Sequence, residues 1–137
     1  ELTLPAEIPG NCMEVIIKFE NNVAEEFGLS ILRSPDGKEK TDIFYERNSG
    51  NLVLNTNNSS LNTSVVGKGI QKAPARLDQS GGLTIRIFID HSIVEVFANG
   101  QTIVKRIYPF SQDATGITIF SRESTTSISS INCWKMN

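Results

Sequence analysis

Residues 83–109 read LTIRIFIDHSIVEVFANGQTIVKRIYP, and their pattern is the clearest indication of the fold. Apolar residues from Leu83 to Ile89 occupy every second position, which is the period of a strand with one buried face. A turn is expected near His91-Ser92. Asn99-Gly100 is a strong hairpin signal, because a type I′ turn needs a positive φ at both central positions. The stretch therefore predicts three consecutive antiparallel strands.

The same alternation recurs on both sides of this stretch. Val15, Ile17 and Phe19 would face one side of a strand, and Ser34-Pro35-Asp36-Gly37 supplies a turn after another. The segment 73–82 contains Pro74 and Gly81-Gly82 and is interpreted as a linker. Further strands are expected around residues 27–31, 41–46, 51–55, 116–121 and 128–136. The fold class predicted is all-β, a two-sheet antiparallel β-sandwich of jelly-roll or concanavalin type with about nine to twelve strands.

Length and composition agree with this class. The 137 residues suit one domain spanning 1–137, and the chain is 39% hydrophobic and 20% charged, which excludes disorder. Its apolar runs are only a few residues long, so no membrane partner is expected. Thirteen Lys and Arg against fifteen Asp and Glu give a net charge of −2, which offers no basic surface for nucleic acid.

Two cysteines, Cys12 and Cys133, lie near opposite ends of the chain. A sandwich could bring its first and last strands side by side and allow a disulfide that closes a long loop. Two buried free thiols are the favoured alternative.

The sequence contains no convincing catalytic or metal-binding group. Asp90, His91 and Ser92 are consecutive, so along a strand they point to alternating sides and cannot form a nucleophilic relay. His91 is the single histidine and has no close ligand partner in the sequence, so neither a metal site nor a cofactor is expected. Asp90 and Glu95 lie on one hairpin, without the opposing carboxylate that a glycosidase needs.

Aromatic and charged side chains on short strands and loops do fit sugar recognition. Rings stack on sugar faces, while Arg donors and carboxylate acceptors bind hydroxyls. A lone tryptophan in a β protein is, however, more typical of the core than of a sugar platform. The candidate ligand-binding residues are Tyr45, Glu46, Arg47, Asp90, Glu95, Arg106, Arg122 and Trp134.

The hairpin at 83–109 resembles the signature hairpin of the C-terminal β-sandwich of glycoside hydrolase family 32, which contains invertases, levanases and inulinases. The likeness extends through MEVIIKF at Met13–Phe19, FGLSIL at Phe27–Leu32, GNLVLN from Gly50 and INCWKM ending at Met136. Carbohydrate-binding module family 66, which binds the terminal fructose of levan-type fructans, is similar in fold.

The resemblance implies a module without catalytic residues. The catalytic motifs of that family belong to a separate N-terminal propeller, and neither Trp-Met-Asn-Asp-Pro, Arg-Asp-Pro nor Glu-Cys occurs in this sequence. Two functions stay open: a binding module for terminal fructosyl units, which is favoured, and a structural domain that supports the catalytic propeller or dimerisation. An extracellular location is implied, and because no leader opens the chain at Glu1, any secretion signal is expected upstream.

Overall fold

The structure is a computed structural model that describes residues 2–3, 11–20 and 23–136. The described residues form eleven strands and no helix, so the predicted all-β class and its number of strands are confirmed. None of the described segments is a helix with the length and hydropathy of a membrane span. The strands are β1 (Leu2–Thr3), β2 (Cys12–Phe19), β3 (Glu26–Arg33), β4 (Thr41–Glu46), β5 (Asn51–Asn55), β6 (Ile70–Pro74), β7 (Leu83–Asp90), β8 (Ile93–Ala98), β9 (Gln101–Arg106), β10 (Gly116–Arg122) and β11 (Ile128–Lys135).

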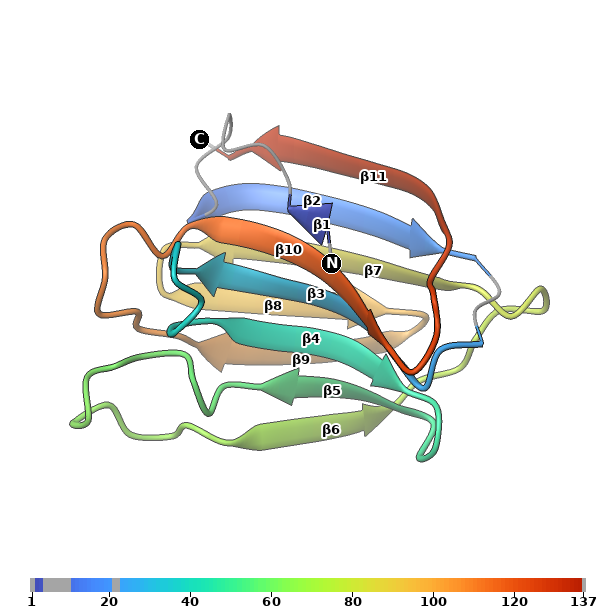
Figure 1. Ribbon diagram of the computed structural model, residues 1–137, viewed down its shortest axis with the longest axis horizontal. Coiled ribbons are helices and arrows are strands. Elements are labelled where there is room, and N and C mark those ends of the chain that lie inside the picture. The colour runs from blue at the N-terminus through green and yellow to red at the C-terminus, as the bar shows by residue number, and fades with distance from the viewer. Residues whose placement is uncertain (1, 4–10, 21–22, 137) are drawn as a thin grey trace.

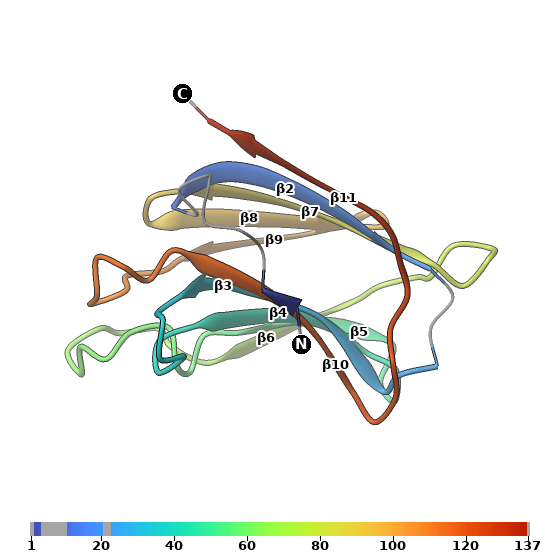
Figure 2. The ribbon, with the colours of Figure 1, turned by 45° about the horizontal axis from the view of Figure 1, so that its top comes forward.

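The strands form two sheets. One has six strands in the order β1-β10-β3-β4-β5-β6, and the other has five in the order β11-β2-β7-β8-β9. Every neighbouring pair is antiparallel. The sheets stack as two layers, and the chain passes from one layer to the other after β6, after β9 and after β10 (Figures 1 and 2). The predicted two-sheet antiparallel β-sandwich is confirmed.

The core lies between the sheets and follows the alternation read from the sequence. Val15, Ile17 and Phe19 of β2 are all fully buried. The register pairs Val15 with Ile87 and Ile17 with Ile85, so the apolar residues of β2 and β7 lie on one face. Their alternate neighbours point outward. The inner side of the sandwich is therefore set by period-2 patterning.

Both hairpins of the 83–109 stretch form. Asn99 and Gly100 have φ values of +43° and +91°, as the predicted type I′ turn requires. At the β7–β8 turn, Asp90 pairs with Ile93 across His91 and Ser92. His91 has a φ of +53°, a region that glycine adopts far more readily than residues with a Cβ.

Strand β6 was not predicted, and the interpretation of 73–82 as a linker is wrong for its first two residues. β6 is the edge strand of the six-stranded sheet, and four of its five side chains are exposed. Ala73 is the one half-buried residue of β6 and packs against the core, so this strand lacks the apolar alternation by which the inner strands were identified. Pro74 at its end is a residue that edge strands tolerate.

The cysteines are free thiols, as the favoured alternative predicted, although each is half-buried rather than fully buried. The register pairs Cys133 with Val15, so Cys133 faces the core side of its sheet. Cys12 is three residues from Val15 on the same strand and therefore faces the opposite side. This difference in face prevents a disulfide, and burial raises the pKa of the Cys133 thiol.

Candidate functional site

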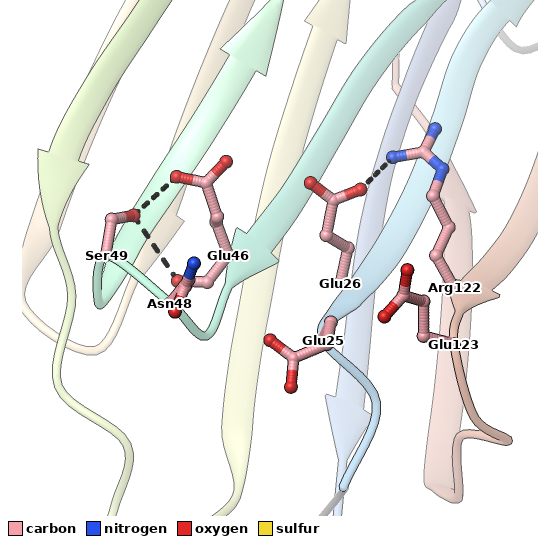
Figure 3. Close-up of a pocket in the computed structure, with 7 residues that line it drawn as sticks. All are labelled: Glu25, Glu26, Glu46, Asn48, Ser49, Arg122 and Glu123. Carbon is pink, nitrogen blue, oxygen red and sulfur yellow. Dashed lines mark hydrogen bonds and ion pairs between the residues drawn. The ribbon is translucent and has the colours of Figure 1, made fainter.

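A surface pocket of about 490 Å³ lies at one end of the six-stranded sheet (Figure 3). It is built where β10 and β4 end and where β3 begins, and antiparallel order brings these three ends to one edge. We call it the acidic pocket because four of its seven residues are glutamates. The lining residues are Glu25, Glu26, Glu46, Asn48, Ser49, Arg122 and Glu123.

Strand register aligns the charged residues of the acidic pocket. Glu26 of β3 pairs with Arg122 of β10 on one side and with Glu46 of β4 on the other. The three side chains therefore form a row across the outer face of the sheet. Arg122 Nη1 donates a hydrogen bond to Glu26 Oε1, as Figure 3 shows, and Arg122 Nη2 lies 3.9 Å from Asp42 Oδ2.

Aromatic rings support the Arg122 guanidinium from below. Its Cζ lies 4.5 Å from the ring centroid of Phe120 and 5.4 Å from that of Phe44. The two rings are 5.9 Å apart in an edge-on arrangement. Phe120 and Phe44 are the register partners of Gly28 on its two neighbouring strands. Because glycine has no side chain, the space between the two rings stays open. Stacking and ion pairing together fix the orientation of Arg122 at the rim of the acidic pocket.

Glu46 is held in its charged form. Ser49 Oγ donates to Glu46 Oε1 at 2.5 Å, and Lys72 Nζ lies 3.1 Å from the same oxygen. The Ser49 hydrogen bond, followed by the Lys72 contact, lowers the pKa of Glu46. A glycosidase acid needs a carboxyl group whose pKa is raised instead. Glu46 is therefore suited to accept hydrogen bonds rather than to donate a proton.

The acidic pocket favours an uncharged, hydroxyl-rich ligand. Its carboxylates accept hydrogen bonds, Asn48 both donates and accepts, and Arg122 donates. An anionic ligand would meet four carboxylates and a single guanidinium and would be repelled. Vicinal hydroxyls, which donate and accept at adjacent atoms, match this mixture of groups.

The structure brings together part of the candidate set from the sequence. Glu46 and Arg122 line the acidic pocket. Arg47 follows Glu46, and its Nε donates to the carbonyl oxygen of Ala24 at 3.0 Å. No pattern in the sequence indicated the other five lining residues, because they are polar strand ends and turn residues that become neighbours only through the register.

The prediction that Tyr45 binds a ligand is wrong, because its side chain lies in the core. Its side chain is 7% exposed and packs into the core, with its ring 5.5 Å from that of Phe27. Along β4 the residues alternate, so Phe44 and Glu46 face outward while Tyr45 between them faces inward.

The other four candidates belong to the five-stranded sheet and lie away from the acidic pocket. Trp134 pairs with Glu14 and is 46% exposed, so the expectation that this tryptophan is in the core is wrong. Its neighbour Cys133 faces the core, which turns Trp134 outward. Glu95 pairs with Phe88 on the same outer face. Asp90 and Arg106 stand at the ends of β7 and β9.

Comparisons with known proteins find one matching family and several similar proteins. Residues 1–135 match the family described as glycosyl hydrolases family 32 C terminal. An acid beta-fructofuranosidase 2, vacuolar, from a Rosa hybrid cultivar is 32% identical over 123 residues, covering 81% of this chain and 19% of the relative. Beta-fructofuranosidase 1 of Zea mays is 25% identical over 144 residues, covering 96% and 22%. The chain spans about a fifth of the length of these curated relatives.

Solved structures agree in fold. The exo-inulinase of Aspergillus awamori superposes with a TM-score of 0.87 at 23% identity, covering 100% of this chain and 27% of the other. Fructan 1-exohydrolase IIa of Cichorium intybus gives 0.86 at 22% identity, covering 98% and 32%. The galectin LEC-6 of Caenorhabditis elegans gives 0.69 at 16% identity, covering 97% and 89%. At these identities the likeness shows a shared β-sandwich.

Proposed function

Because this chain belongs to the C-terminal family of the family 32 glycosyl hydrolases, we propose that it is a non-catalytic domain that binds terminal fructosyl units of fructans such as levan. The acidic pocket is the observation that carries this proposal. The chain would act as part of a larger, extracellular enzyme, beside a catalytic propeller that precedes it. The names of the relatives, which are fructofuranosidases, support fructosides as the substrate class.

In this proposal, one fructosyl end unit occupies the acidic pocket. Two of its hydroxyls donate to the carboxylates of Glu46 and Glu26, and Arg122 donates to a hydroxyl oxygen. Asn48 and Ser49 complete the contacts from the turn after β4. An open pocket with a few hydrogen bonds gives modest affinity, with dissociation constants of roughly micromolar to millimolar, or about −8 to −4 kcal/mol.

Replacing Arg122 with leucine is expected to weaken the binding of levan oligosaccharides by at least about tenfold, because a charge-assisted hydrogen bond contributes about 1.5–3 kcal/mol. Isothermal titration calorimetry on the two proteins measures this directly. The matched control is Arg106→Leu, which removes an exposed arginine at the end of β9 in the other sheet. Unchanged affinity in R122L would contradict the proposal, and loss in R106L would move the site to the five-stranded sheet.

A structural role in docking to a catalytic domain is the second candidate, and exposed apolar side chains favour it. Leu61 and Phe110, which are 54% and 70% exposed, line a pocket of about 350 Å³ beside the turn between β3 and β4. Tyr108 on the same loop as Phe110 is 44% exposed. Apolar groups gathered in this way are typical of a surface that a partner covers.

If this surface docks, the chain alone is expected to self-associate, with a light-scattering mass above that of the 15.1 kDa monomer. Exchanging Leu61 and Phe110 for serine removes the exposed apolar groups and should restore the monomer mass. Arg122→Leu should leave the mass unchanged, which separates docking from sugar binding. A strictly monomeric chain at high concentration would count against the docking role.

A further inference from the structure

Three side chains of metal-binding type meet where β2 begins and β7 ends. The register pairs Cys12 with Asp90, and both point to the outer face because their neighbours Met13 and Ile89 are buried. His91 follows Asp90 in the β7–β8 turn. One ligand atom from each of Cys12, Asp90 and His91 lies within 4.8 Å of the other two. Strand pairing thus brings Cys12 to His91, a neighbour that the sequence alone does not indicate.

The spacing of these atoms suits a small tetrahedral ion. Zinc binds thiolate, imidazole and carboxylate at about 2.0–2.3 Å, which places neighbouring ligand atoms about 3.4–3.7 Å apart. Asp90 and His91 are exposed and Cys12 is half-buried, so side-chain rotation can close the remaining distance. Calcium and magnesium prefer oxygen ligands, so a site with sulfur and nitrogen favours zinc over these two ions.

Backbone contacts orient two of the three ligands. The His91 amide donates to the carbonyl oxygen of Asn11 at 2.7 Å, and His91 Nδ1 lies 3.4 Å from the same oxygen. A proton on Nδ1 that points to this carbonyl leaves Nε2 with the lone pair that a metal needs. Cys12 Sγ lies 3.3 Å from the carbonyl oxygen of Met136. Zinc binding would release the thiol proton to water and break this hydrogen bond, leaving the Cys12 thiolate as the metal ligand.

We propose that Cys12, Asp90 and His91 bind one zinc ion, with water as the fourth ligand. His91 also lines a pocket of about 250 Å³ with Asn11 and Tyr108, which gives water access to the open position. The ion would connect the beginning of β2 to the β7–β8 turn and so brace one end of the five-stranded sheet. The site lies in the other sheet from the acidic pocket and does not depend on sugar binding.

Cobalt(II) substitution tests the proposal, because thiolate ligation to cobalt gives a charge-transfer band in the near ultraviolet. Titration of the reduced chain with Co²⁺ is expected to give this band at one equivalent, and Zn²⁺ should displace it. Competition with a chromophoric chelator then gives the zinc affinity. Cys12→Ser should abolish the band and weaken zinc binding by at least about 100-fold.

Three further variants test whether the band depends on the proposed ligands rather than on any thiol or on a change in the fold. Cys133→Ser removes the other cysteine, which faces the core side of the same sheet, and should leave the band unchanged. His91→Gly removes the single imidazole, and because glycine favours the positive φ at position 91, this variant should stay folded while losing zinc affinity. Asp90→Asn should lose zinc affinity as well.

The expected result is a band present in the wild-type chain and in C133S, absent in C12S, with zinc raising the melting temperature of the first two alone. The proposal is overturned if the wild-type chain gives no band at millimolar Co²⁺. It is equally overturned if the band follows Cys133, or if H91G and D90N bind zinc as tightly as the wild-type chain.

Discussion

Replacing Gly28 with alanine is expected to prevent the six-stranded sheet from forming. Gly28 lies in β3, between β10 and β4 in the order of this sheet. A Cβ at this position would meet the carbonyl oxygen of Ile43 at 2.0 Å and the Cα of Phe44 at 2.5 Å. Both are backbone atoms of the adjacent strand, so β3 and β4 would have to separate. We expect a loss of more than about 4 kcal/mol in the free energy of unfolding, compared with a total of about 5–15 kcal/mol for an ordinary domain.

Gly69→Ala is the matched control for this substitution. A Cβ at Gly69 meets nothing within 4 Å, and its amide donates to Thr56 Oγ1, a contact that alanine keeps. Urea denaturation of G69A should give a midpoint within experimental error of the wild type or slightly above it. A G28A protein that unfolds at the wild-type midpoint would refute the packing described for this position.

The second large effect is expected at Glu39, whose carboxylate is fully buried. Its Oε2 accepts from the amides of Leu61 at 2.8 Å and Phe110 at 2.6 Å, and its Oε1 accepts from the amide of Ser111 at 2.8 Å. One side chain thus holds the loops that follow β5 and β9 against the turn after β3. Glu39→Ala leaves three amide donors without an acceptor, and each buried donor without a partner costs about 1–3 kcal/mol. Water that enters the space left by the side chain would satisfy part of this demand. We therefore expect the free energy of unfolding to fall by about 3–5 kcal/mol.

Glu39→Gln refines this measurement. The carboxamide keeps one acceptor oxygen but turns its NH₂ toward an amide donor, so we expect an intermediate loss of about 2–3 kcal/mol. Glu123→Gln, at an exposed glutamate on the rim of the acidic pocket, serves as the control and should change stability by less than about 0.5 kcal/mol. Equal urea midpoints for E39A and E123Q would contradict the bridging role of Glu39.

Local sequence was a good guide to most strands, but not to β1 and β6. The alternation at Val15–Phe19 and at Leu83–Ile89 predicted which side chains are buried, and Asn99-Gly100 predicted its turn. These features depend on interactions between residues close together in the chain. Strand β6, with its exposed side chains, lacked such a signal and is a strand because β5 pairs with it.

Two of the residues singled out in the sequence meet at the acidic pocket, and the misplacement of two aromatic residues has one cause. Glu46 and Arg122 were singled out by residue type, and both line the acidic pocket. Tyr45 was chosen for the same reason but faces the core, and Trp134 was expected in the core but faces outward. Residue type indicates what a side chain can bind, whereas the face of the strand decides whether a ligand can reach it.

Period-2 alternation and turn chemistry were sufficient to determine an all-β sandwich, because both act within a few residues of the chain. Strand order and register decided the rest. They placed Arg122 beside Glu26, Cys12 beside Asp90, and the Glu39 carboxylate against amides more than twenty residues away in the chain. These contacts join residues that are distant in sequence, and only the pairing of whole strands across each sheet brings such residues into reach of one another.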